Sequence, residues 1–173
     1  MSYKLSMKAK QAIITVHVLS VVCWLGGAAV MLLLGLHVLR AESGDQLHYT
    51  LENMHLVDVV MIRYTALVAL LTGLVLSIWT HWGLFKYYWI VIKLILTLGL
   101  IVFGIQYMGS WLSQLMRDGD LLRDLARSAP GFRQTGYSLM GGAIANIAAL
   151  VFMTAISYFK PFGKINGSQK GKG

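Results

Sequence analysis

One histidine lies within a long apolar segment, in the stretch HVLSVVCWLGG that runs from His17 to Gly27. Neutral imidazole is a common metal ligand, and histidine often holds the iron of haem. The adjacent glycines would leave room for a flat macrocycle, and Trp24 could stack on it. These residues predict His17 as the axial ligand of one b-type haem, with Trp24 and Gly27 as walls of the pocket. The alternative is a histidine that hydrogen-bonds to a neighbouring helix. His17, Ser20, Trp24, Gly27 and Met31 are spaced by three or four residues, so they share one face of the helix, which we expect to point inward.

A second ionisable side chain, Lys93, lies within another apolar segment. Counted along its own helix at about 1.5 Å per residue, it reaches much the same depth as His17, as do Ser77 and Ser157. We therefore expect a polar layer at this depth. Lys93 would supply the counter-charge for an anionic group such as a porphyrin carboxylate. Alternatively, its long side chain carries the ammonium group to the membrane surface.

A different set of soft ligands lies near the opposite membrane surface. Imidazole and thioether groups suit copper, above all the reduced ion. No M-x-x-M or H-x-H spacing is present, and methionine is also an ordinary filler of apolar cores. The alternative metal centre is a copper site, and its candidate ligands are His37, His48, Met54 and His55.

Two further charges, Asp58 and Arg63, lie near the start of the second apolar segment. Residues that are five apart do not share a face of an α-helix as an i, i+4 pair does. We therefore expect each of them to have a partner elsewhere or to reach the membrane interface, and we interpret them as structural or gating charges.

The elements that carry these residues follow from composition and charge. The chain of 173 residues is 57% hydrophobic and only 13% charged, whereas about 25% is usual for soluble domains. About 20 apolar residues cross a bilayer. Four intervals contain no Lys, Arg, Asp or Glu: 11–39, 64–85, 94–116 and 134–159.

These intervals predict an all-α integral membrane protein, a bundle of four transmembrane helices near 12–38, 56–80, 87–109 and 138–159. Residues 1–163 would form this single domain, and the basic tail 164–173 would be disordered.

Charge placement predicts the orientation. Lysines precede the first helix and follow the last, and such basic flanks mark the cytoplasmic side. The first connection carries Glu42, Asp45 and Glu52 and no basic residue. Both termini are therefore expected in the cytoplasm. The net charge of +8 is therefore explained by the basic flanks of the helices, and it does not indicate nucleic-acid binding.

Residues 110–127 have apolar residues at helical spacing, which predicts a short amphipathic helix on the outer membrane surface between helices three and four. Pro130-Gly131 would then form a turn.

Several short motifs, in this order, resemble the copper resistance protein D family and related small bacterial membrane families. The motifs are HVLSVVCWLGG, then LLTGLVLSIW (70–79), then YYWIVIKLILTLGL (87–100), and SYFKPFGK (157–164). The resemblance covers most of residues 12–163. It implies a multi-pass protein of the bacterial cytoplasmic membrane.

A more distant resemblance is to the small four-helix membrane protoporphyrinogen oxidase. That family has His-x6-Trp on its first helix and Trp-x3-Lys on a later one, matched here by His17, Trp24, Trp89 and Lys93. The resemblance implies haem binding through His17. After its two glycines, however, this chain reads GAAVMLLLGLHVLR and lacks the family's apolar-Pro-Arg stretch, which argues against porphyrinogen oxidation.

Three hypotheses follow. The first is a haem-binding protein of the lipid bilayer with a redox or electron-transfer role, working with a redox partner or a quinone. The second is a copper-handling transporter, and the third is a cofactor-free structural or accessory protein. The sequence holds no nucleophilic triad and no phosphate loop, and it leaves open whether the protein is an enzyme.

Overall fold

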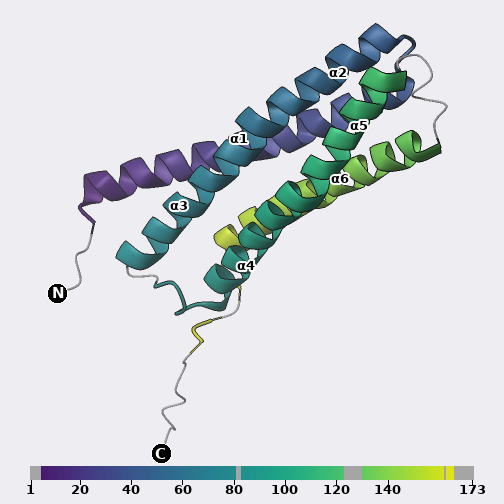
Figure 1. Ribbon diagram of the computed structural model, residues 1–173. Coiled ribbons are helices and arrows are strands. Elements are labelled where there is room, and N and C mark those ends of the chain that lie inside the picture. Colours follow the sequence, from purple (N-terminus) through teal and green to yellow (C-terminus); the bar gives the residue numbers. More distant parts are fainter. Residues whose placement is uncertain (1–4, 81–82, 123–129, 162, 166–173) are drawn as a thin grey trace, which may run out of the picture.

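The computed structural model describes residues 5–80, 83–122, 130–161 and 163–165, and over these residues it is helical with no strand. The chain forms an antiparallel bundle of four long helices (Figure 1). Their elements are α1 (Met7–Arg40); α2 (Gly44–Val57), η1 (Asp58–Arg63) and α3 (Tyr64–Trp79); α4 (Tyr88–Phe103), η2 (Gly104–Met108) and α5 (Gly109–Leu122); and α6 (Pro130–Phe159). Four helices of the described residues are long and apolar enough to cross a membrane. The prediction of an all-helical fold with four apolar helices of membrane-spanning length is confirmed. The predicted tail 164–173 begins with a paired residue, since Tyr87 and Lys164 form an isolated antiparallel bridge, and residues 166–173 lie outside the described residues.

Side-chain caps explain how α1 gives way to α2. The Ser6 hydroxyl accepts a hydrogen bond from the backbone N–H of Ala9 at 3.3 Å and so caps the start of α1. At the next turn Ser43 does the same for Gln46 at 3.3 Å, and the Gln46 amide oxygen accepts from the N–H of Glu42 at 2.9 Å. This reciprocal arrangement resembles a capping box. It reverses the chain within three residues, so that α1 and α2 pack side by side.

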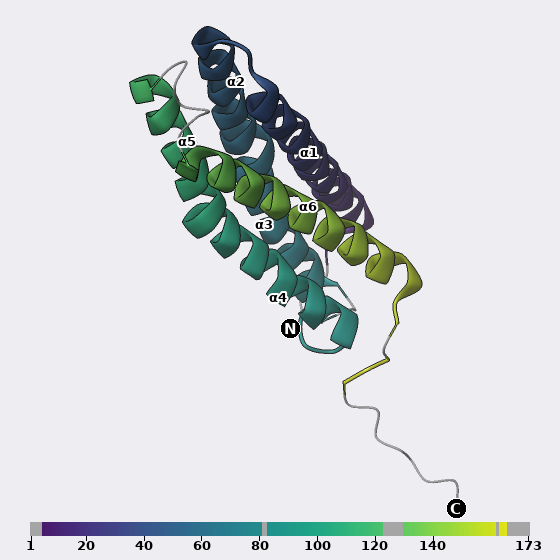
Figure 2. The same cartoon turned by 90° about the vertical axis from the view of Figure 1, so that its right-hand side faces the viewer.

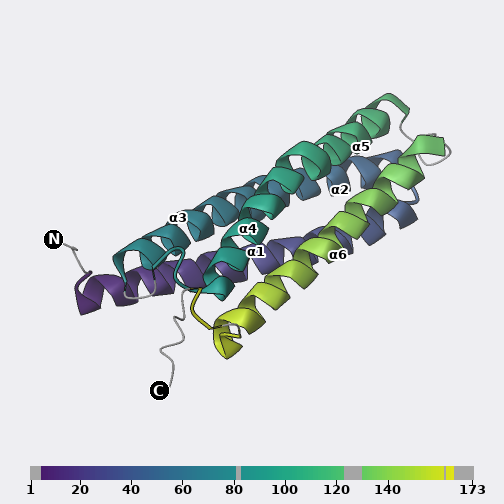
Figure 3. The same cartoon turned by 90° about the horizontal axis from the view of Figure 1, so that it is seen from below.

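The predicted surface helix is wrong in its placement, because α5 continues α4 and η2 without a break and belongs to the bundle. Figure 3 shows α2–η1–α3 and α4–η2–α5 as two long neighbouring rods. The apolar side of α5, with Leu112 and Leu115 fully buried, packs against α2. Gly119 lies so close to α2 that a Cβ there would be 3.0 Å from Leu51. The amphipathic face therefore finds its apolar partner in α2 and not in lipid.

The helices are also longer than predicted. The second helix runs for 36 residues from Gly44 to Trp79, which corresponds to about 54 Å, whereas the hydrocarbon core of a bilayer is about 30 Å thick. The segment expected as the first loop is α2, and the expected turn at Pro130 is the first residue of α6. Proline is favoured there because its missing N–H would have no helical partner. The excess length lies at the end of the bundle formed by α2 and α5.

The prediction that Asp58 and Arg63 have separate partners is wrong. Both lie in η1, a π-helix, and their side chains form an ion pair with 2.6 Å between Arg63 Nη2 and Asp58 Oδ2. A π-helix bonds residue i to i+5, so five residues bring two side chains back to one face. Arg63 also reaches the end of η2, where a Cβ on Gly109 would be 3.1 Å from its Nη2. The two π segments therefore meet at this pair.

The core confirms the inward face predicted for α1. Ser20, Trp24, Gly27 and Met31 are all buried. Seen from the side, α6 lies across α1, α4 and α5 (Figure 2). Two glycines set the approach of α6 to α1: a Cβ on Gly35 would meet Met140 at 2.9 Å, and one on Gly136 would meet Leu39 at 3.0 Å.

Candidate cofactor site

His17 is held by the third helix. Its Nδ1 lies 2.9 Å from the Thr72 hydroxyl oxygen. That hydroxyl has a single hydrogen, which points to the Val68 carbonyl oxygen at 2.6 Å. With that hydrogen engaged, the Thr72 oxygen is left to accept, which favours the tautomer of His17 with its proton on Nδ1. This tautomer leaves the lone pair of Nε2 for another group. Histidines that bind metals usually donate their second N–H in this way.

Gly73 makes room for the imidazole ring. A Cβ at Gly73 would lie 3.3 Å from His17 Cε1, closer than nearly all real contacts of this kind. The Thr-Gly dipeptide of the sequence thus has two roles toward His17, one orienting and one steric. Sequence reasoning missed Thr72 and Gly73 as site residues, although both stand in the quoted LLTGLVLSIW segment.

Lys93 lies between α4 and α6. Its Nζ donates to the Ser157 hydroxyl at 2.6 Å and lies 6.0 Å from the centroid of the Trp89 ring. Ser157 in turn donates to the Met153 carbonyl oxygen at 2.7 Å. Lys93 and Ser157 belong to the same end of the bundle as His17 and Thr72, where α1 and α4 start and α3 and α6 end. We call His17, Thr72, Lys93 and Ser157 the polar layer.

The polar layer lies far from the acidic residues. The seven acidic residues of the chain occur at positions 42–58 and 118–124. Those that the structure describes lie in α2, η1 and α5 and in the turn before α2, at the opposite end of the bundle. We call that end the acidic end. The other is the lysine end, where α1 starts, α3 ends, α4 starts and α6 ends. No described carboxylate can neutralise Lys93.

Trp24 and Gly27, the predicted pocket walls, differ in what they offer. Trp24 is 2% exposed, and its Nε1 has no hydrogen-bond partner. Gly27 lies against η1, where a Cβ would be 2.8 Å from Met61 Cβ and 3.0 Å from Ile62 Cγ1. Met61 and Ile62 occupy the space beside Gly27 in this packing. The glycine therefore brings two helices together, and a macrocycle there would have to displace both side chains.

A second buried polar atom without a partner, Asn146 Oδ1, comes from α6. The contacts of Gly35 and Gly136 fix the antiparallel register of α1 and α6. Counted from these contacts at about 1.5 Å per residue, the levels of Asn146 and Trp24 are about 7 Å apart along the axis of the bundle. Asn146 is 2% exposed. It was not predicted, although an amide in so apolar a helix is a visible signal. One donor and one acceptor without a partner, Trp24 Nε1 and Asn146 Oδ1, are thus buried in the bundle.

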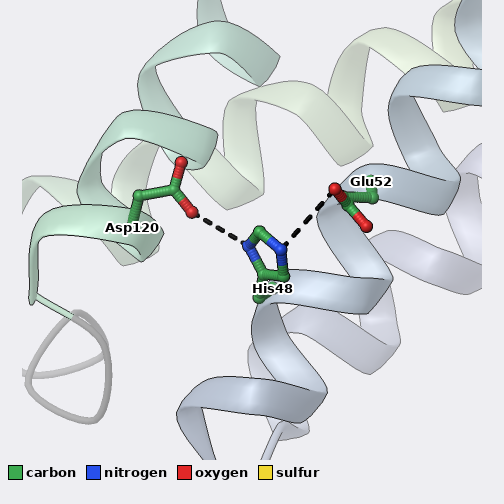
Figure 4. A network of polar contacts seen from close by, with 3 residues as sticks. All are labelled: His48, Glu52 and Asp120. Atoms are coloured by element: carbon green, nitrogen blue, oxygen red, sulfur yellow. Dashed lines mark hydrogen bonds and ion pairs between the residues drawn. The ribbon is translucent and has the colours of Figure 1, made fainter.

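The proposed copper ligands are dispersed. His37 accepts a hydrogen bond from the Gln46 side-chain amide at 2.9 Å, and Met54 is fully buried in the core. His48 bridges α2 and α5 (Figure 4), with Nδ1 2.9 Å from Asp120 Oδ1 and Nε2 3.5 Å from Glu52 Oε1. His55 is exposed and lines a shallow groove with Glu52 and other side chains.

Among the described residues, no group of three or more His, Cys, Asp or Glu side chains could hold a metal ion. His37, His48 and His55 all belong to the acidic end. The remaining histidine, His81, lies outside the described residues. His17 is therefore the single histidine that the structure describes in the polar layer.

Comparison with models of protein families, with curated proteins and with solved structures gave no match. The family resemblance therefore rests on the short motifs of the sequence alone, and the chemistry must be argued from the residues.

Proposed function

We propose that the protein binds one b-type haem in the membrane through His17 and serves in electron transfer. The observation that carries this proposal is the contact of His17 Nδ1 with the Thr72 hydroxyl, 2.9 Å away. If Nδ1–H donates to Thr72, whose own hydrogen is directed to Val68, Nε2 is the ring nitrogen that would hold a metal in the polar layer. Imidazole in this form is the usual proximal ligand of haem iron. When bound, haem supplies one-electron chemistry.

The other residues of the layer suit the remaining parts of such a group. Lys93, which has no carboxylate among the described residues, would pair with a propionate. Trp24 offers its free Nε1–H and an aromatic face. Gly27 is not part of this proposal, because Met61 and Ile62 fill the space beside it. The side chains present thus suit the iron and the carboxylates of such a group.

We further propose the bacterial cytoplasmic membrane as the location, with both termini in the cytoplasm. All nine lysines of the chain fall in segments that belong to the lysine end or flank it, at 4–10, 86–93 and 160–172. The positive-inside rule then assigns the lysine end to the cytoplasm. The polar layer would lie in the cytoplasmic half of the bilayer, within reach of a quinone or a redox partner on that side.

The test is an absorption spectrum of the protein purified in detergent from haem-replete cells, oxidised and reduced with dithionite. We expect a Soret band that sharpens and shifts on reduction. The variant His17→Ala should lose it, and His55→Ala, which removes an exposed histidine at the acidic end, should keep it. Thr72→Val should weaken haemin binding by about 10–100-fold, as loss of an orienting partner does in other metal sites.

Cofactor-free protein is also titrated with haemin, because an expression host can supply too little haem to fill the site. A folded protein that stays colourless and binds no haemin would overturn the proposal, and so would a spectrum unchanged in His17→Ala. Metal analysis of the same colourless protein would then separate the two other hypotheses. Copper would favour metal handling at the acidic end, and a metal-free protein would favour a structural role.

A further inference from the structure

His48 stands between two carboxylates at the acidic end, one on its own helix and one on α5 (Figure 4). Its Nδ1 lies 2.9 Å from Asp120 Oδ1 on α5, and its Nε2 lies 3.5 Å from Glu52 Oε1, one turn further along α2. The three side chains are 47%, 59% and 55% exposed in the order His48, Asp120 and Glu52. The imidazole can therefore exchange its proton with solvent while it keeps both contacts.

The two contacts together suit the doubly protonated ring. A neutral imidazole has one N–H and can donate to one carboxylate only, and the lone pair of its other nitrogen then faces the second carboxylate. The imidazolium ion has an N–H on each nitrogen and can donate to both. The arrangement around His48 therefore fits its charged form better than its neutral form.

The surroundings of His48 hold further groups that bear on its charge. On α2 the ring of Tyr49 lies edge-on, with 5.5 Å between the centroids, and Asp45 precedes His48 by about one turn. On α5 Arg117 precedes Asp120 by about one turn. From α1 and η1, which also pack against α2, no ion pair or hydrogen bond to His48 occurs among the described residues. The direct contacts of the imidazole are thus with anions.

Asp120 belongs to the last turn of α5, which ends at Leu122. Glycine is among the least favourable residues within a helix, and Gly119 stands just before Asp120. The buried apolar contacts of α5, at Leu112 and Leu115, lie earlier in the helix. A bond from His48 to Asp120 therefore joins the least secured turn of α5 to α2.

We propose that His48 is a pH-sensitive latch, which fastens the last turn of α5 to α2 when the imidazole takes up a proton. Free imidazole side chains gain a proton below about pH 6.5, and carboxylates stay ionised down to about pH 4. The latch therefore closes in mildly acidic solution and opens as the pH rises, when His48 keeps at most one of the two contacts. Protonation of histidine acts on helix contacts in this way in other pH sensors. The proposal uses no cofactor and neither residue of the polar layer that carries charge or binds metal.

The test is hydrogen–deuterium exchange, read by mass spectrometry, of cofactor-free protein in detergent at about pH 5.5 and about pH 8, on either side of the imidazole range. The parent is compared with His48→Gln, in which the amide can donate a hydrogen bond but cannot gain a proton. Both chains have the same α5 sequence, so their intrinsic exchange rates cancel at each pH. Near pH 5.5 the amides at the end of α5 should exchange about two- to fivefold faster in His48→Gln. Near pH 8 the two chains should exchange alike.

Two further variants assign the effect to this contact. Asp120→Asn removes the carboxylate from α5 and should abolish the pH-dependent protection although His48 is present. His55→Gln removes another exposed histidine of α2 and should behave as the parent at both pH values. If His48→Gln fails to fold, Asp120→Asn, which leaves α2 unchanged, is read against the parent in its place.

The same ratio of exchange rates at both pH values would overturn the proposal, because His48 would then act only as a neutral hydrogen-bonding residue. A ratio of one at both pH values would overturn it as well, because the contact would then not hold α5. Loss of the pH effect in His55→Gln would assign the titration to the wrong histidine and would also refute the latch. The haem proposal is unaffected by each of these results, since haemin is absent from the assay.

Discussion

Replacing Gly27 by alanine should destabilise the cofactor-free protein. A Cβ at this position would lie 2.8 Å from Met61 Cβ, 3.0 Å from Ile62 Cγ1 and 3.1 Å from the Met61 carbonyl oxygen. The oxygen belongs to the backbone of η1 and cannot rotate away, as a flexible side chain could. The added methyl group must therefore push α1 and η1 apart along a well-packed part of the bundle.

The magnitude follows from two opposing effects. Overpacking of a core costs about 1–3 kcal/mol. Alanine is favoured over glycine inside a helix by about 1 kcal/mol. Because backbone atoms lie in the way, we take the upper part of the first range, and Gly27→Ala should lose about 1–2 kcal/mol of unfolding free energy. Gly141→Ala is the matched control in α6, since a Cβ there meets nothing within 4 Å.

Unfolding of both variants is followed by circular dichroism in mixed micelles with increasing SDS. Gly27→Ala should unfold at lower SDS than the parent, and Gly141→Ala at equal or higher SDS. Equal curves for the two variants would refute the close approach of α1 to η1. If Gly27→Ala weakened haemin binding and left the unfolding curve of the cofactor-free protein unchanged, Gly27 would be a pocket wall after all.

Three further predictions use the same unfolding assay. Arg63→Met should lower the unfolding free energy by about 1–2 kcal/mol, because it leaves the buried Asp58 carboxylate without its cation. Asp58→Asn should lower it less, because the Arg63 side chain that it leaves unpaired is half-exposed. Equal losses in the two variants would argue against the ion pair. Lys93→Met should leave the cofactor-free protein at least as stable as the parent, because it removes a partly buried ammonium group. The same variant should bind haemin roughly tenfold more weakly. Unchanged haemin binding would exclude Lys93 from the site. Asn146→Leu should stabilise the protein by up to about 1 kcal/mol, because its Oδ1 lacks a partner; a large loss would reveal a partner such as a bound water or ligand.

The features that the sequence predicted correctly depend on single helices. Long intervals without charge require membrane-length helices, and spacing by three or four residues fixed the inward face of α1, from Ser20 to Met31. Both arguments use only the period of one helix and the length of one apolar run. No knowledge of a neighbouring helix was needed.

The features that were missed depend on pairs of helices or on departures from the α-helix. The contact between His17 and Thr72 joins residues 55 apart, and that between His48 and Asp120 joins residues 72 apart. Each needs the register between two helices, which no local pattern supplies. The Asp58–Arg63 pair was missed because its spacing was judged with the period of an α-helix.

Charge is separated along the bundle. The described acidic residues and the described arginines belong to the acidic end or to η1, and the described lysines belong to the other end. Any anionic group that enters the lysine half of the bundle therefore meets ammonium groups without competing carboxylates. Within the bundle that group is Lys93, whose Nζ donates to Ser157 at 2.6 Å. Because a carboxylate at the position of Ser157 would neutralise Lys93, Ser157→Asp should weaken haemin binding, whereas Ser157→Ala, which adds no charge, should weaken it much less. Equal haemin binding by the two variants would mean that the charge of Lys93 takes no part in holding the cofactor.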